Sequence, residues 1–232
     1  MINIHNRILD GVSINSGKNQ ITLVIDNGQN VVSIIDMVRL FPSERDINRI
    51  SRFVQDYQKG LEVIDIRTCG LKECIVDETE QKIYLVKPFV GTSFNQMMRR
   101  YQPKDFLESY LRILEICQKC KDQEYGIDPC ADNFRFKKDT LFYVDFFYPF
   151  SKDYVAWKRS RLDLNDLVQR HYYQVQDFFF YPDVFCHAAF DAFRIHPELE
   201  SEIIKTTRRF LLNANFEEFD TRYEEFKRGH KK

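Results

Sequence analysis

The chain has 232 residues, of which 44% are apolar and 30% charged, and its formal net charge is −1. This composition is that of a folded globular protein long enough for a substantial core, as one domain or two small ones. The balanced charge gives no general attraction to nucleic acid or to an anionic membrane. Because no apolar run approaches the ~20 residues of a membrane span and the N-terminus lacks a signal-peptide core, we expect a cytoplasmic protein without a membrane span.

The N-terminal third is rich in strand-like segments. Residues 20–25 and 31–40 read as two strands joined by Asp26-Asn27-Gly28-Gln29, and Asn-Gly between such runs predicts a hairpin. The short segment between Gly11 and Gly17 could cover phosphate groups, but it lacks the Gly-x-Gly-x-x-Gly pattern of kinases and is better predicted as a plain turn.

One helix interrupts the strands. Ser43 is placed as its N-cap, apolar residues recur at helical spacing after it, and the helix is expected to end near residue 58, before Gly60. Three further strands are predicted at residues 61–67, 72–77 and 82–86, the last two joined as a hairpin.

The remainder is predicted to be mainly helical. An apolar stripe runs from residue 103 to about residue 122, and further helices are expected at residues 183–195, 197–212 and 216–227. The basic segment at residues 157–161 is expected to be a solvated surface, with a role in holding an anionic substrate as the alternative.

Six cysteines are present, and in a cytosolic protein they are expected to be reduced. The spacing Cys117-x-x-Cys120 suggests zinc, with Cys130 and the adjacent Cys186 and His187 as possible completing ligands. Because the pair lies in a strongly helical pattern and no second close pair follows, buried apolar thiols are the better prediction.

The most informative stretch covers residues 126–149. Residues 134–136 and 141–144 read as two strands joined by a turn at 137–140, which predicts a hairpin. A hairpin brings the residues before its first strand close to those after its second, so Asp128 and Asn133 are expected near Asp145.

These three side chains suit phosphoryl transfer, which depends on positioning and charge neutralisation. Asn133 and Asp145 offer the oxygen ligands that Mg²⁺ prefers, while Asp128 is placed as the base that accepts the proton of an attacking hydroxyl. Asp132 is a rival for either role because it directly precedes Asn133. Ordinary turn residues flanking a hairpin are the alternative interpretation.

The stretch resembles the catalytic segment of the protein kinase-like superfamily, above all its aminoglycoside phosphotransferase and lipopolysaccharide-kinase branch. Members there carry Gly-Asp-x-x-x-x-Asn, a hairpin and then Ile-Asp-Phe, and this chain has Gly126-Ile127-Asp128, Asn133-Phe134 and Val144-Asp145-Phe146. It departs from the pattern by lacking the loop His and by having Phe147 where protein kinases have Gly.

The resemblance implies a bilobal α+β fold, with a β-rich N-lobe containing one helix at residues 1–90 and a mainly helical C-lobe at residues 91–232. It implies that backbone groups from Lys87 to Phe89 receive the adenine ring of ATP. Arg39 stands where the superfamily has a phosphate-contacting strand Lys, with Asp56 as its candidate partner, or Asp145 in the absence of nucleotide. An exposed strand Arg without a role is the alternative.

The function implied is an ATP- and Mg²⁺-dependent phosphotransferase. The absence of a long activation loop ending in Ala-Pro-Glu favours a hydroxyl of a small molecule or glycan as acceptor. The alternative is a pseudokinase that binds a nucleotide or a partner with little catalysis, which Arg39, the missing helix Glu and the poor Gly-rich loop favour. A third interpretation is an α+β interaction domain in which the three polar residues coincide by chance.

Overall fold

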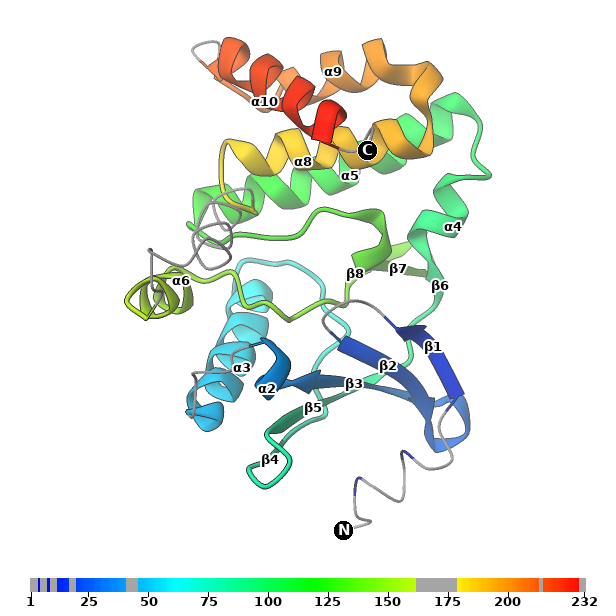
Figure 1. The fold of residues 1–232 in the computed structure, drawn as a ribbon. Helices are drawn as coiled ribbons and strands as arrows, with labels where there is room; N and C mark the ends of the chain where they lie inside the picture. Colours follow the sequence, from blue (N-terminus) through cyan, green and yellow to red (C-terminus); the bar gives the residue numbers. More distant parts are fainter. Residues whose placement is uncertain are drawn as a thin grey trace.

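The computed structural model describes residues 4, 8, 12–16, 20–40, 46–161, 179–212 and 215–229, without the side chains at 12–16, 20, 39, 40 and 229. The predicted α+β class is confirmed: a small sheet forms in the N-terminal part, and the C-terminal part is helical (Figure 1).

The N-terminal sheet has five antiparallel strands in the order β1-β2-β3-β5-β4. The strands are β1 (Val12–Ser16), β2 (Gln20–Ile25), β3 (Asn30–Asp36), β4 (Glu73–Asp77) and β5 (Lys82–Pro88). The predicted hairpin between β2 and β3 is confirmed, with Asn27 (φ 53°) and Gly28 (φ 85°) in the left-handed conformation that such a turn requires. Residues 12–16, expected in a turn, instead form β1.

The two faces of this sheet follow the two-residue period of a strand. Val32, Tyr84 and Val86 pack on one face in a small separate cluster. Ile35 and Leu85 point to the opposite face and join the main core, which also contains the helices. The sheet therefore has one face covered by the rest of the molecule.

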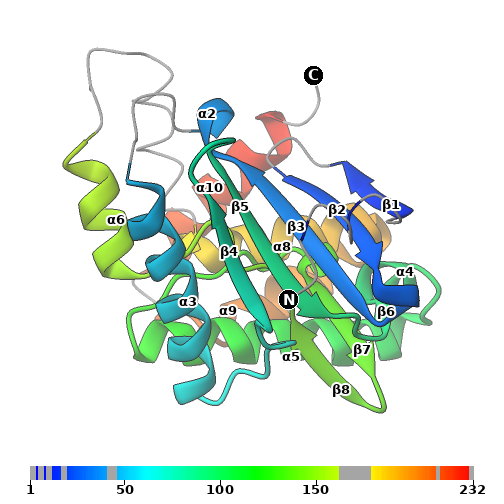
Figure 2. The ribbon, with the colours of Figure 1, turned by 90° about the horizontal axis from the view of Figure 1, so that it is seen from below.

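Helix α3 (Ile47–Val63) packs beside β4 and β5 (Figure 2). The predicted end before Gly60 and the predicted strand at 61–67 are wrong, because Leu61 continues the buried stripe of Val54 and Tyr57. Position 60 requires glycine because the Tyr125 ring occupies the space that a side chain would need. The helix begins after Asp46, whose carboxylate accepts a hydrogen bond from the Arg49 amide (3.0 Å). The predicted N-cap, Ser43, lies outside the described residues.

The predicted strand at residues 31–40 is too long. Pairing with β5 ends at Asp36, opposite Lys82 at the start of that strand, and the short helix α2 (Met37–Leu40) follows. Met37 is buried and its amide donates to the Gln81 carbonyl (3.0 Å), which turns the chain away from the sheet. Arg39 is therefore a helix residue.

The chain leaves β5 through a short strand and becomes helical. The elements are β6 (Thr92–Ser93), α4 (Phe94–Met98), α5 (Pro103–Asp122), α6 (Lys152–Arg159), α8 (Asp183–Ile195), α9 (Glu200–Arg208) and α10 (Phe216–Gly229). The predicted bounds of α5 and α8 are confirmed. Helix α6 was not predicted: Trp157 and Lys158 are buried in it, so only the end of the basic segment, at Ser160 and Arg161, is the predicted solvated surface.

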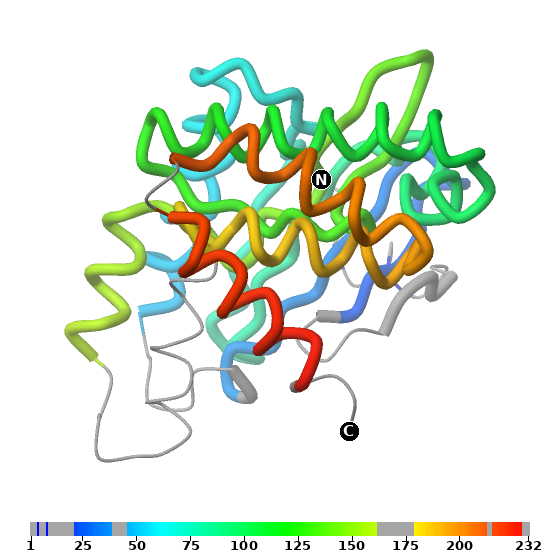
Figure 3. Tube along the Cα trace, turned by 90° about the horizontal axis from the view of Figure 1, so that it is seen from above, coloured from blue at the N-terminus to red at the C-terminus, as the bar shows by residue number. Residues whose placement is uncertain are grey.

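Helices α5, α8, α9 and α10 gather on the side away from the sheet (Figure 3). The Tyr110 hydroxyl donates to Thr207 (2.6 Å), linking α5 to α9, and Arg208 pairs with Asp220 (2.5 Å), linking α9 to α10. Cys117 and Cys120 lie in the buried stripe of α5, as predicted. Among the described helices, none is long and apolar enough to cross a membrane.

The predicted hairpin is confirmed as β7 (Phe134–Lys137) and β8 (Thr140–Tyr143), and β6 adds a third strand beside β7. This small sheet lies between the five-stranded sheet and the helices (Figure 1). The residues at the open ends of the hairpin therefore face the five-stranded sheet.

Candidate functional site

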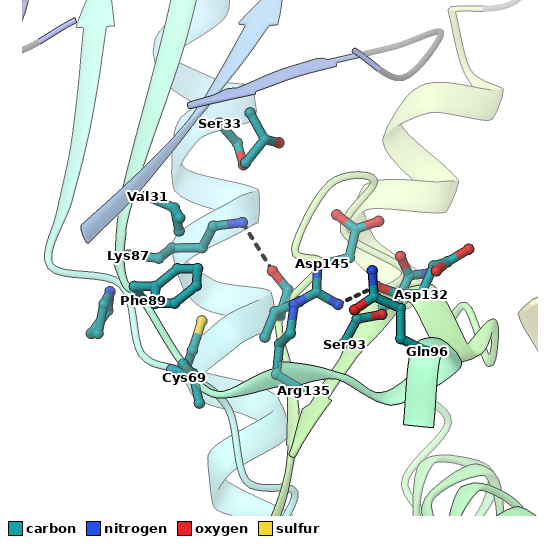
Figure 4. Close-up of a pocket in the computed structure, with 15 residues that line it drawn as sticks. Val31, Ser33, Cys69, Lys87, Phe89, Ser93, Gln96, Asp132, Arg135 and Asp145 are labelled. Atoms are coloured by element: carbon teal, nitrogen blue, oxygen red, sulfur yellow. Dashed lines mark hydrogen bonds between the residues drawn. The ribbon is translucent and has the colours of Figure 1, made fainter. Parts of the chain in front are cut away.

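A cavity of about 380 Å³ lies between the five-stranded sheet and the hairpin (Figure 4). Both parts of the chain contribute to its lining, which consists of Thr22, Val31, Ser33, Cys69, Lys87, Pro88, Phe89, Val90, Ser93, Gln96, Asp132, Asn133, Arg135, Val144 and Asp145. Val31, Phe89 and Val90 supply apolar surface, whereas charged and amide side chains come mainly from Lys87 and the hairpin region.

The sheet wall of the cavity carries a buried cation. Lys87 pairs with Val31 across β3 and β5, so both side chains lie on the covered face of the sheet. The Lys87 side chain is 5% exposed, and its Nζ donates to the Val144 carbonyl (2.9 Å). It also lies 5.6 Å from the centre of the Phe146 ring. The cation is thus directed at the segment that carries Asp145.

A buried hydroxyl lies on the same wall. Ser33 is 1% exposed, and its Oγ has no hydrogen-bond partner among the described residues. Because a buried polar group without a partner costs about 1–3 kcal/mol, this hydroxyl indicates a place for a polar ligand atom or water.

The opposite wall brings Asn133 and Asp145 together, as the hairpin predicts. The Val144 amide donates to the Asn133 carbonyl (2.9 Å), which closes the open end of the hairpin. One Asp145 oxygen accepts a hydrogen bond from the Phe147 amide (3.2 Å), and the Asn133 Nδ2 donates to the Asp128 carbonyl (3.5 Å). A carboxylate and an amide that could hold a divalent cation therefore line one cavity.

Arg135 adds a second cation to the lining. Its Nη1 donates to the carbonyls of Asp132 (2.8 Å) and Phe134 (2.9 Å), and burial lowers the pKa of its guanidinium. The Asp132 side chain is exposed and also lines the cavity. The site therefore combines two cations with two carboxylates, a pattern suited to a ligand that brings both phosphate and metal.

Asp128 lies beside this cavity without being among the described residues that line it. Its Oδ1 accepts a hydrogen bond from the Cys130 amide (3.1 Å) and lies 4.0 Å from His187 Nδ1. The side chain is 23% exposed. Of the two candidate bases, Asp132 therefore faces the cavity, and Asp128 faces the neighbouring side of the same loop.

The loop that carries these acids is held from two sides. The Tyr57 hydroxyl of α3 donates to the Gly126 carbonyl (2.8 Å), and the Ala131 amide donates to Asp191 of α8 (2.8 Å). Burial raises the pKa of the Asp191 carboxyl, while the bond from Ala131 acts in the opposite sense. The loop conformation is therefore fixed by the protein before any ligand binds.

The structure does not leave the backbone at Phe89 free for the predicted contact with an adenine ring. The Phe89 amide donates to the Gln29 carbonyl (2.9 Å), so this group is already used and does not await an adenine ring. The Phe89 ring is 44% exposed and lines the cavity, where it can stack on a planar ligand. Asp56 is exposed on α3, and the Arg39 side chain lies outside the described part of the structure.

Sequence reasoning missed Ser33, Arg135 and the side chain of Lys87. A usable signal was present for Lys87, because it continues the inward alternation of Ile83 and Leu85 in a predicted strand. A charged residue at a position that should face the core is a mark of a functional site.

Comparison of the sequence with protein-family models gives no match, and comparison with curated proteins likewise gives no significant match. The functional assignment therefore rests on the geometry of the site.

Proposed function

We propose that this chain has a protein kinase-like fold and is an ATP- and Mg²⁺-dependent phosphotransferase acting on a hydroxyl of a small molecule or glycan. One observation carries the proposal: a single cavity joins the Lys87 ammonium of the sheet to Asn133 and Asp145 beside the hairpin. Phosphoryl transfer requires this combination of a fixed cation and metal-ligating oxygens.

The lining suits a metal-bound nucleotide. Asn133 and Asp145 would hold Mg²⁺, which favours oxygen ligands. Val31 and Phe89 offer apolar surface to a base, and the Ser33 hydroxyl offers a hydrogen bond to a polar group. When bound, Mg-ATP supplies the phosphoryl group to be transferred and part of the charge neutralisation.

The residues of the chain then have separate tasks. Lys87 holds the Asp145 segment through the Val144 carbonyl and would supply the positive charge for a phosphate group. Asp128 accepts the proton of the acceptor hydroxyl, with Asp132 as the rival base because it faces the cavity directly. The Asp128 side chain is 23% exposed and lies outside the cavity lining, so an acceptor would have to reach it from outside the nucleotide cavity.

The order of the elements supports the kinase-like interpretation. A five-stranded antiparallel sheet with a helix between β3 and β4 is followed by a long helix and then by the hairpin. One departure concerns α3. In place of an acid paired with a strand Lys, this helix contacts the loop through Tyr57, and its late Glu62 accepts a hydrogen bond from Thr68 (2.6 Å).

A second candidate function is a pseudokinase scaffold. The Phe89 amide is already used by Gln29, and the Lys87 ammonium by Val144, which reduces the groups available to a nucleotide. The two functions differ in turnover, and the experiments below separate them.

The first experiment measures melting temperature with ATP, with and without Mg²⁺. Wild-type protein should be stabilised by Mg-ATP more than by ATP with a chelator, and Asp145→Asn should lose most of that difference because a neutral amide compensates Mg²⁺ poorly. Asp122→Asn, at an exposed position near the end of α5, is the matched control and should behave as wild type. Absence of any ATP effect on the wild type would overturn the proposal.

The second experiment identifies the base. Asp128→Asn should leave Mg-ATP affinity nearly unchanged and slow turnover by roughly 10²–10⁴-fold, the usual range for general base catalysis. Slow ATP hydrolysis serves as the assay until an acceptor is found. If Asp132→Asn has this effect and Asp128→Asn does not, the base is Asp132. Nucleotide binding by the wild type without turnover would favour the scaffold.

A further inference from the structure

A second cluster of polar side chains lies beside the nucleotide cavity. Asp128, Cys130 and His187 each offer one ligand-type atom, and these atoms all lie within 4.8 Å of one another. Cys130 Sγ is 3.5 Å from His187 Nε2, and Asp128 Oδ1 is 4.0 Å from His187 Nδ1. Cys130 and His187 have no place in the phosphotransfer chemistry proposed above.

The fold fixes the positions of these groups. Asp128 and Cys130 come from the loop that Asp191 of α8 binds through the Ala131 amide (2.8 Å). His187 lies one helical turn before Asp191 on the same helix. The loop is therefore attached to α8 next to the imidazole that faces it.

The imidazole is oriented by aromatic packing. The ring of His187 stacks on Phe226 of α10 (5.7 Å between centroids, 4° between planes) and meets the edge of Phe179 (5.4 Å). Its Nδ1 is buried and has no hydrogen-bond partner among the described residues. The ring thus presents its other nitrogen, Nε2, to the Cys130 thiol, while the unpartnered Nδ1 is on the side of the Asp128 carboxylate.

The same residue types also occur in nucleophilic triads, but the distances argue against one here. A triad requires a hydrogen bond from the imidazole to the acid that orients it, of about 2.6–3.2 Å. The separation of 4.0 Å between His187 Nδ1 and Asp128 Oδ1 is too long, and that oxygen already accepts the Cys130 amide. A metal ion needs only donor atoms at suitable separations.

We propose that Asp128, Cys130 and His187 form a Zn²⁺ site, with water in the fourth position. At Zn–S and Zn–N distances of about 2.3 and 2.0–2.1 Å, tetrahedral geometry places sulfur and nitrogen roughly 3.5 Å apart. This is the separation found between Cys130 Sγ and His187 Nε2. Thiolate and imidazole favour Zn²⁺, whereas Mg²⁺ favours the oxygen ligands of the neighbouring cavity.

The site has a regulatory consequence, which rests on the proposed function. A carboxylate bound to Zn²⁺ cannot accept the proton of an acceptor hydroxyl, so Zn²⁺ should inhibit turnover while Mg-ATP still binds. The shared residue is Asp128, and Asn133 and Asp145 remain available to the nucleotide.

The test measures Zn²⁺ binding directly, without nucleotide, by competition with a chromophoric chelator on the reduced 232-residue chain. We expect one ion per wild-type chain, and absorption by the Co²⁺-substituted protein typical of thiolate coordination. Cys130→Ser and His187→Gln should each weaken Zn²⁺ by about 100-fold or more, since even changes beyond the direct ligands cost 10–100-fold. Cys74→Ser, at a partly buried cysteine of β4, is the matched control and should bind as wild type.

Equal Zn²⁺ affinity in the wild type, Cys130→Ser and His187→Gln would overturn the site, as would a wild type that does not compete with the chelator. Circular dichroism of each variant establishes that it is folded, and a variant that fails to fold is replaced by Asp128→Asn. Nucleotide binding is measured in a separate assay. A protein that binds Zn²⁺ but no ATP would refute the phosphotransferase and support the zinc site. A protein that binds ATP but no Zn²⁺ would refute the zinc site and leave the phosphotransferase unaffected.

Discussion

Lys87 lies at a position where the pattern of β5 calls for a buried apolar residue. Ile83 and Leu85 point to the same face and are fully buried. Removing an ammonium from water is costly unless a hydrogen bond compensates it, and the Val144 carbonyl at 2.9 Å does so. Because a single neutral carbonyl offsets the burial of a charge only in part, Lys87 is expected to add little to stability.

Replacing Lys87 with Met should separate these two roles. Met fills similar space and removes the cost of burying a charge, which offsets the lost hydrogen bond to the Val144 carbonyl, so the free energy of unfolding should change little. Mg-ATP affinity should fall by about 10–100-fold. That range corresponds to the 1.5–3 kcal/mol typical of a hydrogen bond to a charged group. Calorimetric titration with Mg-ATP and urea unfolding measure the two quantities. A large loss of stability with unchanged affinity would make Lys87 a structural residue.

Lys158 is a second buried lysine, at the end of α6, and burial lowers its pKa to about 8. Its Nζ lies 4.5 Å from the centre of the Tyr148 ring. Because the pKa of the folded protein is depressed, the unfolded chain binds more protons between about pH 8 and about pH 10.5. Stability from this residue should therefore rise with pH across that window and be lost as pH falls through about 8.

Lys158→Met should remove this pH dependence. The wild type should gain about 2 kcal/mol relative to the variant between about pH 7 and about pH 9.5, and the variant should be the more stable protein at neutral pH. Urea unfolding at both pH values gives the difference. Parallel pH profiles for the two proteins would show that folding does not lower the pKa of Lys158.

Among the elements, the connection from the five-stranded sheet to the helical part depends on Gly91. Its φ is +51°, and a side chain there would run into the Phe136 carbonyl of β7. The neighbouring Val90 and Ser93 line the cavity, so the path of this connection positions part of the site. Glycine at this position satisfies both the backbone conformation and the close approach.

Gly91→Ala should therefore destabilise the protein by more than Gly70→Ala. Gly70 also has a positive φ (+74°), but nothing lies within 4 Å of the space that a side chain would fill. Gly70→Ala should lower the free energy of unfolding by about 1 kcal/mol, from the backbone conformation alone. Gly91→Ala should lower it by about 1–3 kcal/mol more, because its side chain collides with β7. Denaturant unfolding of both variants tests this. Equal losses would show that β7 moves aside without cost.

The sequence pattern of neighbouring residues predicted helices and strands correctly where the packing in the structure follows that pattern. The apolar stripe of α5 and the Asn-Gly turn between β2 and β3 gave correct elements because both signals are contained in adjacent residues. The end of α3 was missed because glycine usually ends a helix, whereas here the Tyr125 ring makes Gly60 a packing requirement. That contact joins residues far apart in sequence, and no local pattern contains it.

Only the part of the candidate site that depends on local structure was predicted. Asn133 and Asp145 follow from the hairpin, which is a local structure. Lys87 was assigned a backbone role, and Arg39 was chosen as the cation, because the strand was extended past Asp36. Which residue of a sheet faces a cavity depends on register and pairing, and these are set by partners elsewhere in the chain.

At the scale of the whole molecule, the sheet and the helical part share the main hydrophobic core and also meet through polar contacts around the cavity. Lys87 reaches the Val144 carbonyl, and the Tyr57 hydroxyl reaches the Gly126 carbonyl. The Lys87 ammonium comes from one part, and the Asn133 and Asp145 oxygens come from the other. A ligand that contacts both must therefore stabilise their association as well as its own site.

Hydrogen exchange should reveal this coupling. At a Mg-ATP concentration of about 100 times Kd, binding stabilises the bound state by about 2.7 kcal/mol, which slows exchange about 100-fold for amides exposed only when the two parts separate. Protection is expected in β2 and β3 of the sheet and in residues 131–147, with α10 unchanged as an internal control. In Lys87→Met, protection of the sheet should fall most, because the contact to the phosphate originates there. Protection confined to residues 131–147 in the wild type would mean that the ligand binds the hairpin region alone, and the sheet would then have no part in the nucleotide site.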